Sequence, residues 1–161
     1  MLALPEIFIL AMTCIVLLVD LFVKQKKQTI TYCLTQLTLL GTVVLILLHI
    51  PEKTTLLFHG LYIEDRLASV LKIVIVVCSI FVFMYSRDYM RQRDMGKGEP
   101  YLLGLFSILG MMVLVSANNF ITMYLGLELM SLPIYALVAL QHDSAKSSEA
   151  GMKYFVLGAL A

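Results

Sequence analysis

The amino-acid sequence predicts an all-α integral membrane protein with about six transmembrane helices. Of its 161 residues, 60% are hydrophobic and only 14% are charged, whereas soluble domains are about half apolar and about a quarter charged. Apolar stretches of near membrane-spanning length recur along the whole chain. The basic residues between these stretches alternate in number from one connector to the next. These three observations together predict the fold class.

Each predicted span is an apolar stretch bounded by charged or turn residues. A bilayer core is crossed by about 20 helical residues, and backbone groups in lipid must be satisfied within the helix itself. The first five spans are expected at Leu4–Val23, Thr29–Ile50, Leu67–Ser86, Tyr101–Ser116 and Phe120–Leu140. A sixth begins near Ser147 and is still apolar at Ala161. We therefore expect one membrane domain over residues 1–161 that is part of a longer protein.

The connectors predict how the chain is oriented in the membrane. The first, third and fifth hold most of the basic residues, which are Lys24, Lys26, Lys27, Arg87, Arg91, Arg93, Lys97 and Lys146. The second holds only Lys53 and Arg66, and the fourth holds none. The positive-inside rule places the basic connectors in the cytoplasm and the N-terminus on the outer side. No basic segment precedes the first apolar stretch, so we interpret that stretch as a retained span rather than a signal peptide.

Several function classes find no support in the sequence. The net charge is only +1, which gives no field favouring nucleic acid. There is no phosphate-binding loop, dinucleotide-binding motif or redox-ligand cluster, so no cofactor, metal or covalent active site is expected in this chain. The cysteines stand singly in apolar runs, which predicts small buried hydrophobes: Cys14, Cys33 and Cys78. The histidines lack metal-ligand spacing and are expected at the surface: His49, His59 and His142.

Glu128 is the strongest candidate for a functional residue, because it lies near the middle of the fifth predicted span. A charged group at the bilayer centre costs about 2.5–3.5 kcal/mol on insertion scales, so such residues are rare and face protein or water. Tyr124, Ser131 and Tyr135 fall on the same helical face, and this polar stripe would hold a file of water molecules. The pattern suits proton transfer. The alternative is a neutral Glu128 hydrogen-bonded to a neighbouring helix.

Pro133 lies in the same predicted span and removes one backbone donor, which exposes the carbonyl of Leu129. It would either bend the helix and open a hydrated pocket or form an ordinary membrane kink. Small residues elsewhere suit close helix packing, and they are Gly104, Gly110, Gly126, Ala150, Gly151 and Gly158.

Two lysines and two carboxylates complete the candidates. Lys153 lies about two turns into the sixth span, with Glu149 four residues earlier and able to pair with it. Lys153 would serve a proton path or extend its amine to the cytoplasmic surface. Lys72 is close enough to the end of the third span to reach the surface, and this interpretation is favoured over a functional one. Glu6 and Asp20 flank the first span, where solvated interfacial positions are expected.

Several stretches carry a family resemblance. They are Leu4-Pro5-Glu6-Ile7-Phe8, Leu18-Val19-Asp20-Leu21-Phe22, Tyr62–Lys72, Glu99-Pro100-Tyr101-Leu102-Leu103, Tyr124-Leu125-Gly126-Leu127-Glu128-Leu129-Met130-Ser131-Leu132-Pro133 and Glu149-Ala150-Gly151-Met152-Lys153-Tyr154. Over essentially the whole chain, the sequence resembles the N-terminal third of the subunit N family of bacterial respiratory complex I, the proton-translocating NADH–quinone oxidoreductase. The Glu128 stretch is specific to the wider antiporter-like superfamily, and the flanking stretches favour subunit N.

The resemblance implies a fold of about fourteen helices built on two inverted repeats. Residues 1–100 would form the first three helices with a cytoplasmic connector, and residues 101–161 the start of the first antiporter-like repeat. The family glutamate matching Glu128 pairs with a lysine of a broken helix that lies beyond this chain. Lys153 matches another lysine of the family's hydrophilic axis. Lys72, Tyr124, Ser131, Pro133 and Glu149 are possible supporting residues.

The resemblance also implies where other components lie. NADH, flavin, iron–sulfur clusters and quinone would belong to other parts of the complex. The expected partners are the other membrane subunits, the lipid bilayer, protons and water, and the expected location is the bacterial inner (plasma) membrane. Two alternatives stay open. One is a subunit of a cation/proton antiporter or membrane-bound hydrogenase, and the other is a structural membrane scaffold in which Glu128 is a neutral packing group.

Overall fold

The computed structural model describes residues 3–22, 28–51, 54–92, 98–140 and 144–160. It confirms the all-α fold. The six helices are α1 (Leu4–Phe22), α2 (Gln28–Leu48), α3 (Arg66–Gln92), α4 (Glu99–Val115), α5 (Phe120–Val138) and α6 (Ala145–Leu160). Their bounds lie close to the predicted spans, except that α3 continues to Gln92 instead of ending at Ser86.

Four of these helices are long and apolar enough to cross a membrane, namely α1, α2, α3 and α5. The apolar helix α4 is shorter, with 17 residues. Helix α6 has 16 residues and begins with a polar turn, Ala145-Lys146-Ser147-Ser148. The six predicted spans therefore correspond to six helices, of which the four longest apolar ones meet the length and composition of a span.

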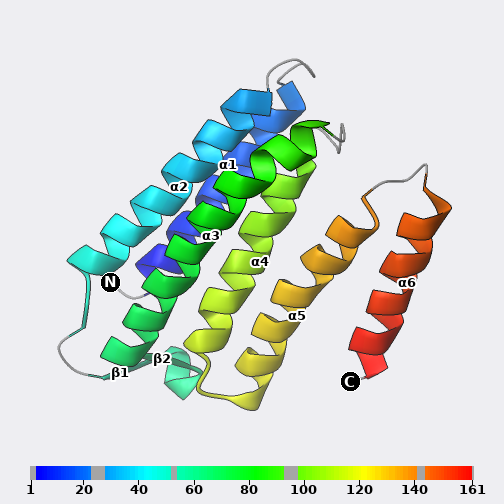
Figure 1. Cartoon of the computed structure of the whole chain (residues 1–161). Coiled ribbons are helices and arrows are strands. Elements are labelled where there is room, and N and C mark those ends of the chain that lie inside the picture. Colours follow the sequence, from blue (N-terminus) through cyan, green and yellow to red (C-terminus); the bar gives the residue numbers. More distant parts are fainter. Residues whose placement is uncertain (1–2, 23–27, 52–53, 93–97, 141–143, 161) are drawn as a thin grey trace.

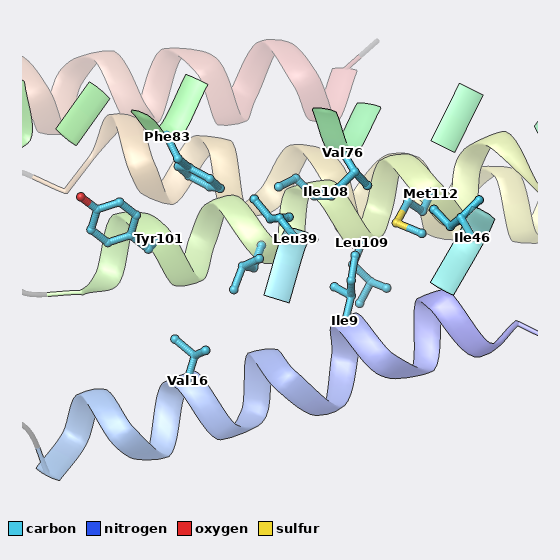
Figure 2. Close-up of a cluster of buried hydrophobic side chains, with 11 residues drawn as sticks. Ile9, Val16, Leu39, Ile46, Val76, Phe83, Tyr101, Ile108, Leu109 and Met112 are labelled. Atoms are coloured by element: carbon cyan, nitrogen blue, oxygen red, sulfur yellow. The ribbon is translucent and has the colours of Figure 1, made fainter. Parts of the chain in front are cut away.

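Helix α4 is the centre of the bundle. It packs against α1, α2, α3 and α5, while α6 packs on α5 at the edge (Figure 1). The buried core lies between α4 and the first three helices, and Figure 2 shows its side chains meeting between the ribbons. In α1 and α3 the core residues recur after seven positions, as Ile9 with Val16 and Val76 with Phe83. This spacing keeps one helical face toward the partner helix.

A small β-hairpin, which the sequence did not predict, covers one end of the bundle. Strands β1 (Thr55–Leu57) and β2 (Tyr62–Glu64) pair antiparallel around the one-turn helix η2 (Phe58–Gly60). The backbone N–H of Ile63 donates to the Ser116 carbonyl at 2.9 Å. The hairpin is thereby attached to the connector between α4 and α5. We call this side of the molecule, where the hairpin and that connector lie, the hairpin end (Figure 1).

The described parts of α1 and α2 bury several hydroxyl groups that were not among the candidates. Thr35, Thr38 and Thr42 on α2 each donate to the carbonyl four residues earlier, which satisfies the hydroxyl inside the helix. Thr31 instead donates to Asp20 at 2.8 Å. Asp20 lies near the end of α1 and is half-buried, and its carboxylate accepts this hydrogen bond, so its interfacial position stays a prediction.

The three cysteines are exposed on the described surface, so the prediction that they are buried is wrong. Their apolar runs face outward as well as inward, because a membrane-spanning helix is apolar around its circumference. An apolar sequence context therefore does not separate the core from the outer surface in this chain.

Candidate functional site

Helix α5 carries the central candidate and is held closely against α4. A Cβ atom added to Gly110 would collide with the backbone of Met130, and one added to Gly126 would collide with the backbone of Leu114. Ser107 also donates to the Met130 carbonyl across the same interface at 3.1 Å. Small residues allow this close approach, as predicted for these two glycines. The interface fixes which face of α5 is turned away from α4.

Glu128 lies near the middle of α5 and is half-buried. The hydroxyl of Tyr124 interacts with its carboxylate, and the hydroxyl of Ser131 donates to its backbone carbonyl at 3.4 Å. Tyr135 packs edge-on against Phe155 of α6, with ring centroids 6.1 Å apart. Of the three residues predicted beside Glu128, only Tyr124 therefore reaches its carboxylate. Within the described residues, Glu128 forms no ion pair.

Pro133 lies inside α5, which continues past it to Val138. It lines a cavity of about 300 Å³ between α3, α4 and α5. The lining is mostly apolar and includes Phe83, Gly104 and Ile108, with hydroxyl groups from a few serines. The cavity beside Pro133 is therefore lined mainly by apolar side chains.

Lys153 and Glu149 form the expected pair on α6, with 2.6 Å between the Lys153 Nζ and Glu149 Oε1 atoms. Their side chains are 69% and 66% exposed. Gly151, on the opposite face of this turn, packs against Ala139. The pair thus lies on the outward face of the helix at the edge of the bundle.

Lys72 is in a different place from the one predicted. It is 1% exposed, and its Nζ lies 2.6 Å from Glu6 Oε1 and 3.0 Å from the Tyr62 hydroxyl. The predictions of an amine reaching the surface and of a solvated Glu6 are therefore wrong, because α1 and the hairpin cover both groups. The sequence did contain a signal for this pair. Glu6 lies in the first turn of one span, and Lys72 lies near the end of another span on the same side of the membrane.

Metal binding finds no support in the described residues, in which no group of three or more potential ligands occurs. His49 and His59 are exposed as expected, and His142 lies outside the described residues. Most of the basic connector residues also lie outside them: Lys24, Lys26, Lys27, Lys53, Arg93 and Lys97.

A bundle of long apolar helices that contains ionisable side chains defines a multi-span membrane protein. The family described as "NAD(P)H-quinone oxidoreductase subunit 2 N-terminal" matches residues 1–88. The family described as "NADH:quinone oxidoreductase/Mrp antiporter, TM" matches residues 117–161. The chain belongs to the NAD(P)H-quinone oxidoreductase subunit 2 N-terminal family.

Relatives and a solved structure agree with this assignment and with the resemblance seen in the sequence. The chain is 49% identical to NADH-quinone oxidoreductase subunit N of Thioalkalivibrio sulfidiphilus and 50% identical to that of Thiobacillus denitrificans, over 98% and 99% of this chain and 33% of each relative. A chain of respiratory complex I from Thermus thermophilus with bound aureothin matches with a TM-score of 0.77 and 26% identity, over 98% of this chain and 33% of that one. The chain thus spans about a third of the length of its relatives.

Proposed function

We propose that this chain is the N-terminal part of a proton-translocating membrane subunit of NADH–quinone oxidoreductase, in which Glu128 accepts and releases protons. The observation that carries this proposal is a half-buried carboxylate in the middle of an apolar helix, with a hydroxyl group beside it and no cation paired to it among the described residues. Intramembrane carboxylates with this setting mark proton relays. The names of the relatives support the same function.

The neighbouring side chains have supporting roles in this proposal. The Tyr124 hydroxyl donates a hydrogen bond to the Glu128 carboxylate when that group is ionised. Ser131 and Pro133 shape the helix behind Glu128. Lys153 is the next proton-transfer group along the chain, and Glu149 contacts its amine at 2.6 Å. Glu128 lies on α5 and Lys153 on α6, and the proposed proton transfer between them runs through water.

The wider setting is proposed from the relatives. The chain carries no cofactor of its own, and NADH, flavin, iron–sulfur clusters and quinone are bound elsewhere in the complex. Its partners are other membrane subunits, lipid, water and protons, in a bacterial inner membrane. Residues 1–100 and 101–161 form an N-terminal helical part and the start of an antiporter-like repeat. The two family matches, at residues 1–88 and 117–161, support this division.

The proposed orientation places the hairpin end on the outer side of the membrane and the opposite end, with Arg87 and Lys146, in the cytoplasm. Single cysteines at Asn118 and Lys146, introduced into an otherwise cysteine-free protein, should react with a membrane-impermeant thiol reagent from opposite sides. Labelling of both positions from one side would overturn the orientation.

The substitution Glu128→Gln tests the function in the complete subunit assembled in its complex. The change keeps size and hydrogen bonding but removes the titratable carboxyl group. Proton pumping should fall steeply while the amount of assembled complex stays normal. Glu99→Gln is the matched control, because Glu99 is an exposed carboxylate at the start of α4. Unchanged pumping in Glu128→Gln would remove the basis for the proposed role.

A cation/proton antiporter subunit is the second candidate function. The family that matches residues 117–161 is described by both activities, and an intramembrane glutamate suits either. Co-purification separates the two, because an oxidoreductase subunit copurifies with redox subunits. Purification of the complete protein without any redox partner would favour the antiporter.

A further inference from the structure

The described residues contain a second buried ionisable cluster, and it is remote in sequence from Glu128. Glu6 in the first turn of α1 and Lys72 in α3 meet at 2.6 Å, with side chains 8% and 1% exposed. Tyr62 of the hairpin accepts a hydrogen bond from Lys72 at 3.0 Å, and its ring lies 5.2 Å from the same amine. Four elements therefore converge on this cluster, since Ser116 at the end of α4 lies close to the Tyr62 hydroxyl.

The cluster has more hydrogen-bonding capacity than its protein neighbours use. Lys72 approaches one carboxylate oxygen, Glu6 Oε1. Glu6 Oε2 and Ser116 Oγ are buried near the Tyr62 hydroxyl, and neither makes a hydrogen bond of good geometry among the described residues. Buried polar atoms without partners are rare and are usually bridged by internal water. A carboxylate oxygen and a hydroxyl beside a phenol provide the polar contacts that one water molecule needs.

Tyr62 supplies the hydroxyl group that links these atoms. Burial and the negative charge of Glu6 raise the pKa of Tyr62 above its usual range, so the phenol keeps its proton. Because Lys72 already donates to the phenol oxygen, the phenol proton is free to point to Glu6 or Ser116. Glu64 on the same strand is the other carboxylate whose charge acts on Tyr62.

We propose that Glu6, Lys72, Tyr62 and Ser116 form a water-containing proton-exchange site at the hairpin end, separate from Glu128. A proton from the external solution adds to the bound water, and that water passes one of its own protons to Glu6 Oε2, the oxygen that Lys72 does not approach. An O–H bond forms at Oε2 and the water is left neutral. Lys72 keeps its charge and holds the carboxyl group in place. The buried side chains Ala3 and Leu57 pack with Tyr62 and cover the site. Release of the proton reverses these steps.

A role in stability alone makes a different prediction from a role in proton exchange. Removing both charges of a buried pair together is often tolerated, whereas removing one is not. The double variant Glu6→Gln with Lys72→Met therefore keeps assembly in either case. It keeps proton pumping only if the pair is structural.

The test uses the complete subunit in its assembled complex, reconstituted into liposomes, with protons moved per electron donor oxidised as the measurement. This experiment rests on the proposed function, because the complex must pump protons. The double variant should assemble at the normal level and pump at least about twofold less per turnover. Asp20→Asn, at the other end of α1, is the control. A normal pumping ratio in the double variant would overturn the proposal.

Tyr62→Phe decides the matter if the double variant does not assemble. It keeps both charges and the aromatic ring but removes the linking hydroxyl, so the pumping ratio should again fall at least about twofold. A normal ratio in an assembled Tyr62→Phe complex would overturn the proposal. Glu128→Gln is measured in parallel. Loss of pumping there with normal pumping in the variants of this cluster would defeat only the second site, and the reverse result would defeat only the role of Glu128.

Discussion

The described part of the chain contains two glutamate–lysine pairs of equal length in opposite surroundings. Both the Glu6–Lys72 and the Glu149–Lys153 distances are 2.6 Å. The first pair is almost fully buried, and the second is about two-thirds exposed. A buried charge loses its hydration and depends on its partner, whereas an exposed pair gains little from the partner. The difference shows that distance identifies an ion pair but burial determines what it contributes.

The two pairs also differ in how the chain brings them together. Glu149 and Lys153 are one helical turn apart, so any helix over these residues makes them neighbours. Glu6 and Lys72 come from α1 and α3 and meet only when the bundle and the hairpin have formed. The buried pair thus reports tertiary structure, and the exposed pair reports a local helix.

Lipid does not solvate charges, so the exposed pair on α6 needs water or further protein around it. The relatives are about three times as long as this chain. We propose that their remaining sequence supplies helices that cover α5 and α6 and enclose Glu128 and Lys153 in a shared polar region.

The largest expected difference between the pairs comes from removing one charge. Lys72→Met leaves Glu6 buried and unpaired, which should lower the free energy of unfolding by about 3–5 kcal/mol. Lys153→Met, of the same chemistry, should lower it by only about 0.3–0.5 kcal/mol, because the pair is exposed and within one helix. Denaturant titration in micelles measures both. Similar losses in the two variants would show that burial does not separate them.

The exposed pair and the helices follow from local pattern, which explains why they were predicted. Apolar stretches locate each helix to within a few residues, except at the end of α3, where Arg87 and Asp88 continue the helix beyond its apolar part. The placement of Lys153 beside Glu149 needs only the helical repeat. Glu128 was located as an intramembrane carboxylate for the same reason.

The buried pair could not be predicted in this way, because it depends on the hairpin. Each strand has only three residues, too few to show an alternating pattern. Its turn places Phe58, His59 and Gly60 at positive φ, of 49°, 58° and 86°, and only Gly60 is a residue type that signals such a turn. Without the hairpin, Lys72 would lie near a free helix end, and an amine reaching the surface was the reasonable expectation.

A smaller effect is expected from the hydroxyl group that belongs to the buried pair alone. Tyr62→Phe removes the hydrogen bond from Lys72 but keeps the ring 5.2 Å from the amine. The free energy of unfolding should fall by about 1 kcal/mol, as for other hydrogen bonds inside membrane proteins. Tyr154→Phe beside the exposed pair is the control and should have little effect, since Tyr154 is 56% exposed. An equal change in the two variants would contradict the buried role of Tyr62.

The smallest expected effect is the response to salt, which separates the pairs without changing the burial of either. Raising the ionic strength from about 0.1 M to about 1 M shortens the screening length from about 10 Å to about 3 Å. In the 161-residue chain in micelles, a double-mutant cycle on Glu149 and Lys153 should therefore lose its coupling of a few tenths of a kcal/mol. The cycle on Glu6 and Lys72 should not change, because ions do not enter the covered site. Repeating the double-mutant cycle on Glu149 and Lys153 in the complete subunit tests whether further helices cover α6. Coupling that persists in high salt would mean that the pair is enclosed there. Coupling that again disappears would leave the pair at a water-exposed surface.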